Sequence, residues 1–485
     1  MNRFYVACDL GTETCRVMLG TLHKDKLTIS EVRSFPNPPV QEKDSLQWNV
    51  PQIYQELLNA LREISVYEEP VDGISCNSWG ADYMLFEKDG TLVRPTYHYA
   101  DPRSQAGMKE VLSKITAEAI YEETGVPQTP TSTLFQLGAE KSKRLKRNQL
   151  LPIADAFNFL LSGVPRVEMS SASTTQLYNP VARNWSGKFM SALRLPPELF
   201  PAVTPAGTKL GPLNPELSKQ TKLEEVQVVT TCSHELAASL TGLPVQHGES
   251  WAFLRAGPWC TLGTELIGPI INEASRQSAF ANQMGYGGSV QFSKHVVGLW
   301  ILDECKRFWQ ERDHDLHDDL LAHLATSSPP FESLIDPADP RFLTPGEMPL
   351  KIQAFCKETN QPVPRKPGPI LRCVLESLAL LYRKTLQEME QLTGREFSRL
   401  YLLGATNHSL LYHFIANALQ IPVIIAPAET TAIGNVIVQA LALGHIKSLE
   451  AARELVRASF KMETIVPHAA VWNAAYDRLA ELAPS

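Results

Sequence analysis

The sequence contains no uninterrupted run of about 18 apolar residues, so it predicts no membrane-spanning helix. None of its eight cysteines stands in a Cys-x-x-Cys pair, which argues against a zinc site. Basic residues are not in excess: 45 Lys and Arg face 52 Asp and Glu, a net charge of −7, so neither nucleic acid nor an anionic membrane is an expected partner. The N-terminus lacks a basic region followed by an apolar one, and we therefore expect no signal peptide and a cytoplasmic location.

Several stretches resemble ligand motifs but lack the spacing that such motifs need. Gly285-Tyr286-Gly287-Gly288 fits neither a dinucleotide fingerprint nor a P-loop. We interpret the acidic residues 313–319 as a solvated surface and the basic residues 141–147 as a solvated helix end. Cys356 and Cys373 flank a proline-rich loop and could approach each other, although a reducing compartment argues against a stable disulfide.

A chain of 485 residues is too long for one hydrophobic core, and we expect two domains. Short apolar runs separated by turn residues predict strands at 4–10, 16–22, 27–34 and 71–77, and apolar residues at helical spacing predict a helix over 50–64. Helices are also predicted over 107–124, 296–308, 370–392 and 432–443, and strands at 226–231, 251–262, 267–271, 400–403 and 421–426. This alternation predicts an α/β protein.

The same strand–turn–strand pattern occurs twice, about half a chain apart. Residues 4–16 and 251–263 each have an apolar run, a tight turn with small residues and a second apolar run. Backbone N–H groups in such a turn can surround a phosphate. The repetition predicts two related domains that face one nucleotide. Pro258, in the second turn, has no N–H to donate.

Asp9 ends the first predicted strand, directly before the first turn. A carboxylate beside a phosphate-binding turn commonly holds magnesium through water, but it can also cap its own turn. Arg16 could reach a phosphate or pair with Glu13.

Ser233-His234-Glu235 stands where a predicted strand leads into a helix, the place at which α/β enzymes expose side chains to a ligand. Glu235 could act as a general base toward a hydroxyl and His234 could bind the substrate. The competing interpretation is helix capping, since Ser233 is a good N-cap and an acidic residue is favoured in the first turn.

The segment Trp79-Gly80-Ala81-Asp82 follows another strand. Trp79 can stack on a sugar, Gly80 permits close approach of a ligand, and Asp82 can bind hydroxyl groups. Asp101 and Arg103 offer a further carboxylate and guanidinium, which could instead pair with each other.

A collinear set of motifs over nearly the whole chain resembles the FGGY carbohydrate kinases, and among them most closely the bacterial rhamnulokinases. The set comprises Asp9-Leu10-Gly11, Trp79-Gly80-Ala81-Asp82, Asp101-Pro102-Arg103, Thr174-Thr175-Gln176-Leu177, Ser233-His234, Gly298-Leu299-Trp300, Asp339-Pro340-Arg341-Phe342, the run 377–382 and Gly434-Asn435.

The resemblance implies two actin-like (ribonuclease H-like) ATPase domains around a central cleft. We expect residues 1–242 to form the domain with the sugar side and the catalytic base, 243–460 the nucleotide-binding domain and 461–485 a helical tail. The implied reaction transfers the γ-phosphate of ATP, with Mg²⁺, to a primary hydroxyl of a ketose, as from L-rhamnulose to L-rhamnulose 1-phosphate. The implied partners are a small-molecule sugar and ATP, and the sequence indicates no oligomeric state.

Carried over position by position, the resemblance implies Glu235 as catalytic base, Asp9 as the magnesium residue and a sugar side with Gly80, His234, Asp82 and His295. It implies an ATP side comprising Thr12, Glu13, Thr14, Cys15, Arg16, Pro258, Asp303 and Gly404. Glu235 replaces the family's aspartate, Pro258 its threonine, and Leu403-Gly404-Ala405 its Gly-Gly-Gly. The side chains of Leu403 and Ala405 are therefore expected where bare backbone would meet the nucleotide. These departures keep open an alternative function: a catalytically impaired sugar-binding or regulatory protein on the same scaffold.

Overall fold

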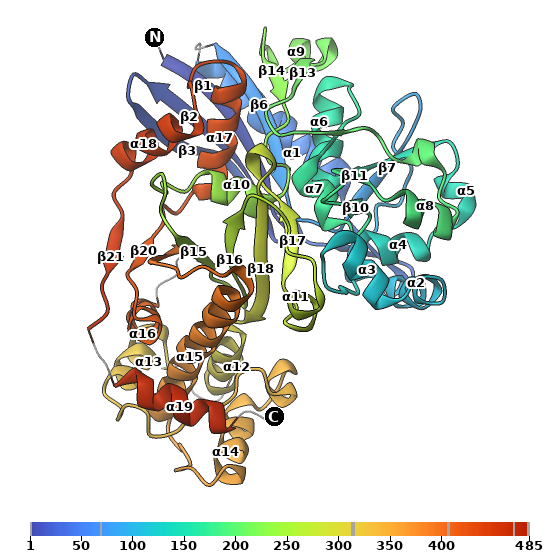
Figure 1. The fold of residues 1–485 in the computed structure, drawn as a ribbon. Coiled ribbons are helices and arrows are strands. Elements are labelled where there is room, and N and C mark those ends of the chain that lie inside the picture. The colour runs from blue at the N-terminus through green and yellow to red at the C-terminus, as the bar shows by residue number, and fades with distance from the viewer. Residues whose placement is uncertain (1, 68–69, 312–315, 405–407, 469–470, 483–485) are drawn as a thin grey trace. The chain divides into compact units, whose positions relative to one another are not determined.

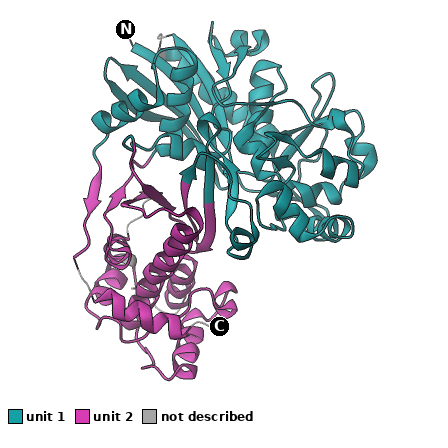
Figure 2. Cartoon of the chain, viewed as in Figure 1, with its two compact units in different colours: residues 1–247, 265–292, 429–461 teal, residues 248–264, 293–428, 462–485 magenta. Residues whose placement is uncertain are grey.

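The computed structural model describes residues 2–67, 70–311, 316–404, 408–468 and 471–482 (Figure 1). The chain forms two compact units (Figure 2). Unit 1 comprises residues 1–247, 265–292 and 429–461, and unit 2 comprises residues 248–264, 293–428 and 462–485. The predicted boundary at residue 242 is close to the first division, but two later segments of the chain also belong to unit 1. Within the described ranges, no helix has both the length and the apolar character needed to cross a bilayer.

Unit 1 contains a six-stranded sheet of order β13-β14-β6-β1-β2-β3. Its strands are β1 (Asn2–Leu10), β2 (Thr14–His23), β3 (Lys26–Pro36), β6 (Val71–Ser78), β13 (Lys209–Pro212) and β14 (Gln227–Val229). β1, β2 and β3 pair antiparallel, whereas β6 runs parallel to β1 and β14 parallel to β6. The strands predicted at 4–10, 16–22, 27–34 and 71–77 are therefore confirmed, each within a few residues.

Alternate residues of β1 face two different cores, as the period of a strand requires. Val6 and Cys8 pack in one cluster with α1 (Val50–Ile64), whose predicted bounds are confirmed. Tyr5 and Ala7 pack on the other side with α17 (Thr430–Ala442) and α18 (Leu449–Ser459). Because the sheet is covered on both faces, its apolar strands lie in the interior and polar side chains reach a ligand only at the strand ends.

The remaining elements of the first 247 residues are short. The helices are α2 (Arg103–Leu112), α3 (Ala117–Thr124), α4 (Thr133–Gly138), α5 (Ser142–Leu145), α6 (Ile153–Ser162), α7 (Met169–Thr174), α8 (Gly187–Leu193), α9 (Pro215–Thr221) and α10 (Glu235–Thr241). The strands are β4 (Val40–Glu42), β5 (Ser45–Gln47), β7 (Tyr83–Glu87), β8 (Asn148–Pro152), β9 (Val167–Glu168), β10 (Tyr178–Asn179), β11 (Asn184–Trp185) and β12 (Val203–Thr204).

A seven-stranded sheet has the order β17-β18-β16-β15-β19-β20-β21. Its strands are β15 (Trp251–Arg255), β16 (Trp259–Leu266), β17 (Ala281–Met284), β18 (Val290–Val297), β19 (Arg399–Leu403), β20 (Val423–Ile425) and β21 (Glu463–Ile465). β15 pairs antiparallel with β16 and parallel with β19, which repeats the arrangement of β1 with β2 and β6. The repeated strand–turn–strand pattern of the sequence therefore corresponds to a repeated strand topology.

The long helices of unit 2 are α12 (Trp300–Gln310), α13 (Asp318–Thr326), α14 (Met348–Glu358), α15 (Pro367–Thr393), α16 (Ser409–Leu419) and α19 (Trp472–Leu482). α15 packs against α12, α13 and α16. The thiols of Cys356 on α14 and Cys373 on α15 interact, which lowers the pKa of Cys356 and raises that of Cys373, and all eight cysteines are buried free thiols.

Three sequence predictions were wrong in part. Residues 267–271 form no strand, since Gly268 and Pro269 interrupt it, and Ile267 is 87% exposed. The helix predicted over 107–124 is two helices, because the side chain of Thr116 caps α3 and starts it anew. The helix predicted to start at residue 296 starts at Trp300, because the two valines before Gly298 end strand β18.

Candidate active site

Asp9 is the centre of a polar network at the carboxyl end of β1. Its carboxylate accepts hydrogen bonds from Arg16 Nη2 at 2.9 Å and Asn77 Nδ2 at 2.7 Å. Asp9 pairs with Arg16 across β1 and β2 and with Asn77 across β1 and β6. The strand register therefore brings the three side chains together, and Asp9 binds its neighbours rather than capping its own turn.

Arg16 also binds Glu429, immediately before α17, at 2.8 Å. The guanidinium thus lies between two carboxylates, and it pairs with Asp9 and Glu429 rather than with Glu13, the partner considered from the sequence. Asn435 on α17 donates to Asn77 Oδ1 at 2.9 Å and accepts from Gln439 at 2.7 Å. Helix α17 therefore fixes the network of Asp9 from two points.

Glu235 begins α10 and is partly exposed. Burial and the negative charge of Glu235 raise the pKa of Asp9, while Arg16 and Asn77 oppose the increase. The two carboxylates therefore lie close enough to repel each other. A divalent cation that takes oxygen ligands would relieve this repulsion.

The residues present fit magnesium better than a metal held by the protein alone. Within the described part of the chain, no group of three or more His, Cys, Asp or Glu side chains could hold a metal ion. Magnesium is commonly bound through one or two carboxylates, several waters and phosphate oxygens of the substrate. Asp9 is a carboxylate of the kind that such a site uses, and the carboxylate of Glu235 acts on it electrostatically.

The turn between β1 and β2 is held from one side by Asn37. Asn37 donates its side-chain amide to the Gly11 carbonyl at 2.9 Å and its backbone N–H to the Glu13 carbonyl at 2.8 Å. Glu13 and Thr14 are exposed, and Thr12 is partly exposed. The Cys15 side chain is buried, and burial raises the pKa of its thiol to about 12. Thr12 to Thr14 therefore face solvent, and Cys15 anchors the turn in the core.

Asp82 is buried rather than presented to solvent, with 1% of its surface exposed. One carboxylate oxygen accepts from Trp48 Nε1 at 2.6 Å, Trp79 Nε1 at 3.0 Å and the Tyr99 N–H at 3.2 Å, and the other accepts from Gln136 at 2.8 Å. Burial raises the pKa of Asp82 to about 6 against these hydrogen bonds. The carboxylate therefore orients an aromatic cluster.

That cluster stands where the sequence predicts the sugar side. The ring of Trp48 lies 4.5 Å from Trp79 and 4.3 Å from His98, centroid to centroid. Gly80, next to Trp79, is so close to Thr174 that an added Cβ would lie 2.8 Å from the Thr174 side chain. Gly80 thus permits a close approach of α7. Asp101 and Arg103 do not form a side-chain pair: Arg103 binds Glu140 and Gln136 instead.

His234 and Glu235 are both partly exposed and follow Ser233, which is 1% exposed. Ser78, at the end of β6, donates its N–H to the Ser233 carbonyl at 2.8 Å. This bond places the start of α10 beside the end of β6, so that His234, Glu235 and Asp9 belong to one edge of the sheet.

In unit 2 the predicted ATP residues occupy turns and a helix start. Pro258 lies in the turn between β15 and β16, and its carbonyl accepts from the N–H groups of Gly298 and Trp300 at 3.0 and 3.2 Å. Asp303 is exposed in the first turn of α12, and Gly404, also exposed, follows β19 with a φ of 64°. Ala405 lies outside the described residues. His295, on β18, bonds through Nδ1 to Thr261 at 3.0 Å.

Leu403 changes the interpretation of the Gly-Gly-Gly replacement. Its side chain is 2% exposed in the core of unit 2, although the sequence suggested that it would meet the nucleotide. Its carbonyl accepts a hydrogen bond from the Ala256 N–H at 2.9 Å. The residue therefore contributes to packing, and Gly404 keeps the left-handed backbone that glycine adopts without strain.

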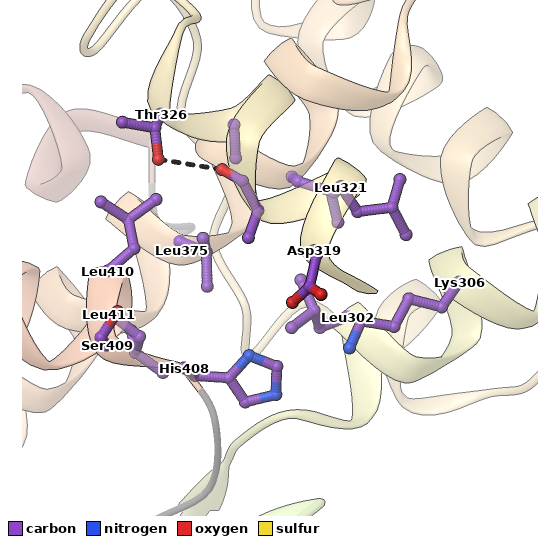
Figure 3. A pocket seen from close by; sticks show the side chains of 13 residues that line it. Leu302, Lys306, Asp319, Leu321, Thr326, Leu375, His408, Ser409, Leu410 and Leu411 are labelled. Atoms are coloured by element: carbon purple, nitrogen blue, oxygen red, sulfur yellow. Dashed lines mark hydrogen bonds between the residues drawn. The ribbon is translucent and has the colours of Figure 1, made fainter. Parts of the chain in front are cut away.

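A pocket of about 340 Å³ opens between α12, α13, α15 and α16 (Figure 3). Leu302, Leu375 and Leu411 supply apolar surface, and Lys306, Asp319 and His408 supply polar groups. Leu302 is adjacent to Asp303, and His408 comes four positions after Gly404 in the chain. Two lining residues of this cavity are therefore close in sequence to predicted ATP residues, although Asp303 and Gly404 do not themselves line it.

Sequence reasoning missed the partners that orient the predicted residues. Glu429, Asn37, Trp48 and Asn435 are separated from Asp9 or Asp82 by tens to hundreds of positions. Only Asn435 gave a signal, as part of the Gly434-Asn435 motif. The others are single polar or aromatic residues without a local pattern.

Family models match most of the chain, and curated relatives match nearly all of it. The N-terminal domain model of the FGGY family of carbohydrate kinases matches residues 4–242, and the C-terminal domain model matches residues 252–443. The chain is 32% identical to a rhamnulokinase of Bacteroides thetaiotaomicron, covering 98% of each chain. It is 33% identical to a rhamnulokinase of Enterococcus faecalis, covering 95% of this chain and 94% of that one.

Solved structures show the same fold at low sequence identity. A ligand-bound xylulose kinase from Lactobacillus acidophilus superposes with a TM-score of 0.83 at 14% identity, covering 99% of this chain and 97% of that one. A Plasmodium falciparum glycerol kinase with ADP gives a TM-score of 0.81 at 14% identity, covering 99% of this chain and 98% of that one. The predicted actin-like, two-domain α/β fold is confirmed.

Proposed function

Because the chain belongs to the FGGY family of carbohydrate kinases, whose members use ATP, we propose that it phosphorylates a primary hydroxyl of a ketose, with L-rhamnulose as substrate and L-rhamnulose 1-phosphate as product. The observation that carries the proposal is the placement of two carboxylates at one edge of the unit 1 sheet: Asp9 lies near the end of β1, and Glu235 begins α10, whose start is bonded to the end of the neighbouring strand β6. The choice of L-rhamnulose rests on the rhamnulokinases to which the chain is similar over nearly its full length.

In the proposed mechanism Glu235 removes the proton from the attacking sugar hydroxyl. His234 and Glu235 are successive residues with partly exposed side chains, so we assign His234 to a second hydroxyl and Glu235 to the first. General-base catalysis of this kind contributes roughly 10²- to 10⁴-fold in rate. The Ser78–Ser233 bond fixes where the Glu235 side chain begins, and glutamate carries its carboxylate one methylene further from that point than the family's aspartate does.

Asp9 would hold Mg²⁺ together with phosphate oxygens and water. When bound, the ion neutralises the negative charge that the phosphoryl group carries during transfer. Arg16 is already shared between Asp9 and Glu429, so we assign it to orienting Asp9 rather than to binding the phosphoryl group directly. The exposed turn of residues 12–14 offers backbone N–H groups and hydroxyls to the phosphates.

The pocket of unit 2 is the proposed site of the nucleotide base. Its volume of about 340 Å³ lies within the range of roughly 300–1,000 Å³ usual for small-ligand sites. Lys306, Asp319 and His408 line the pocket together with the leucines (Figure 3), so that their polar groups can bind the edge of a base while the leucines contact its faces.

Filling this pocket should weaken ATP binding selectively. Ala322 lines the pocket on α13, and we expect Ala322→Trp to weaken Mg-ATP binding at least about 10-fold by excluding the base. Thermal-shift titration with Mg-ATP measures the effect, since a ligand that binds the folded state raises the melting temperature. Ala474→Trp is the matched control, because Ala474 is an exposed helical alanine of unit 2 outside the pocket. Equal ATP affinities of the two variants would place the base elsewhere.

The function itself is tested by ADP release from purified protein with Mg-ATP and one of five acceptors: L-rhamnulose, L-fuculose, D-xylulose, L-ribulose or glycerol. We expect sugar-dependent turnover to be fastest with L-rhamnulose. Faster turnover with another acceptor would replace the substrate assignment. Folded protein that binds a sugar but turns over none of the five would contradict the kinase assignment.

The turn at Pro258 favours a second candidate function, a sugar-binding or regulatory protein without kinase activity. Pro258 has no N–H, and the Ala256 N–H already donates to Leu403. Fewer backbone donors therefore remain for phosphates at this turn. The two functions differ in ATP binding: a melting temperature unchanged by millimolar Mg-ATP would favour the regulatory protein.

A further inference from the structure

Two buried carboxylates lie beneath the segment that carries Glu235. Asp155 belongs to α6, and Glu168 ends β9 directly before α7. Asp155 is 1% exposed and Glu168 is fully buried. Neither reaches solvent, so neither is placed to contact a substrate, and the mechanism above uses neither of them.

Both carboxylates bind Ser233, two residues before Glu235. Glu168 Oε2 accepts the Ser233 N–H at 2.9 Å, and Asp155 Oδ1 accepts the Ser233 hydroxyl at 2.7 Å. The Ser233 carbonyl accepts a hydrogen bond from Ser78. All three polar groups of Ser233 are therefore hydrogen-bonded: its backbone N–H, its hydroxyl and its carbonyl.

The same cluster holds the next residue through a serine. His234 donates its backbone N–H to Ser170 Oγ at 3.0 Å, and Ser170 donates both its hydroxyl and its N–H to Glu168 Oε2. Asp155 also accepts the hydroxyl of Ser171 through its other oxygen. Successive peptide groups leading to Glu235 are therefore fixed by Glu168, directly at Ser233 and through Ser170 at His234.

Burial of these two carboxylates lowers the stability of the folded protein. Burial raises the pKa of Asp155 to about 7, and burial together with the charge of Asp155 raises the pKa of Glu168 to about 8. Glu168 Oε1 is buried without a hydrogen-bond partner among the described residues. Apolar side chains often replace buried ionisable groups without loss of stability, and strongly perturbed carboxylates concentrate at functional sites.

We propose that Asp155 and Glu168 are positioning residues, which fix the peptide groups of Ser233 and His234 and so set the direction of Glu235 toward the sugar hydroxyl. The inference rests on the proposed function, because it takes Glu235 as the base. Asp155 and Glu168 do not touch the substrate, and their effect is on the rate of phosphoryl transfer. A displacement of about 1 Å at a reacting group can cost roughly 10²-fold in rate.

Two pairs of variants separate positioning from packing. Ser233→Ala and Ser171→Ala each delete a buried serine hydroxyl that bonds to Asp155, but only Ser233 belongs to the segment before Glu235. Glu168→Leu removes the acceptor of three hydrogen bonds, whereas the amide oxygen of Glu168→Gln can accept all three. We expect Ser233→Ala and Glu168→Leu to lower kcat at least about 10-fold with the ketose Kd changed less than about 3-fold. Ser171→Ala and Glu168→Gln should keep kcat within about 3-fold of wild type.

The outcomes are distinguishable from failure of the proposed function. If Ser171→Ala loses as much kcat as Ser233→Ala, or if Glu168→Gln loses as much as Glu168→Leu, the positioning role is overturned. If the wild-type protein phosphorylates no ketose, the proposed function fails independently. Hydrogen exchange of the Ser233 and His234 amides then tests the anchoring: faster exchange in Glu168→Leu than in Glu168→Gln supports it, and equal exchange overturns it.

Discussion

Glu235→Gln is expected to lower kcat for sugar phosphorylation by about 10²- to 10⁴-fold, because the amide cannot accept a proton from the attacking hydroxyl. The substitution keeps the shape of the side chain and the start of α10. It also removes a negative charge that raises the pKa of Asp9, so Asp9 ionises at lower pH in the variant. Binding of the ketose, measured by calorimetry, should therefore remain close to that of wild type, and the loss should appear in kcat.

A matched control lies in the same unit. Glu216 is the first-turn glutamate of α9, a helix of seven residues like α10, and it is exposed. Glu216→Gln should leave kcat unchanged. Glu235→Asp moves the carboxylate back by about 1.5 Å, and we expect an intermediate loss near 10²-fold. If Glu235→Gln retained wild-type kcat, the base would have to be another residue.

The position of Asp9 illustrates what local sequence can predict. An apolar run followed by a polar turn predicts both a strand and the residue that ends it, and β1 indeed ends at Leu10, one residue beyond Asp9. The surroundings of Asp9 cannot be predicted in this way. They depend on Asn77, which approaches through the sheet, and on Glu429, which approaches through α17. Such partners are set by topology, and no pattern near Asp9 identifies them.

Asp82 and Leu403 show that a sequence motif does not predict the direction in which a side chain points. Asp82 was predicted to bind hydroxyls, yet its oxygens accept hydrogen bonds from two indoles, a backbone N–H and an amide in the interior. Leu403 was expected beside the nucleotide and lies in the core. In both cases the sequence indicates that a residue stands at the end of a strand, but only the packed structure shows which way its side chain points.

The second large effect is expected at Gly434, where α17 crosses α10. A Cβ at this position would lie 1.8 Å from the Ala238 carbonyl oxygen and 3.0 Å from the Gly242 nitrogen. Both are backbone atoms, so Gly434→Ala must push α10 and α17 apart by roughly 1 Å or more to reach van der Waals separation. Overpacking of this kind costs about 1–3 kcal/mol or more, which we expect as a fall of at least several degrees in melting temperature.

Gly434→Ala should also lower kcat, because the two helices carry the site: Glu235 begins α10, and Asn435 of α17 binds Asn77 beside Asp9. A displacement near 1 Å predicts a loss of about 10²-fold in kcat in protein that remains folded. Gly187→Ala is the control, since Gly187 begins α8 and an added Cβ would meet no atom within 4 Å. We expect that substitution to change stability by less than about 1 kcal/mol and to leave kcat unaltered. Calorimetric melting and steady-state kinetics of both variants measure the two effects together. A Gly434→Ala protein with wild-type stability and kcat would show that the α10–α17 crossing does not control the distance between Glu235 and Asp9.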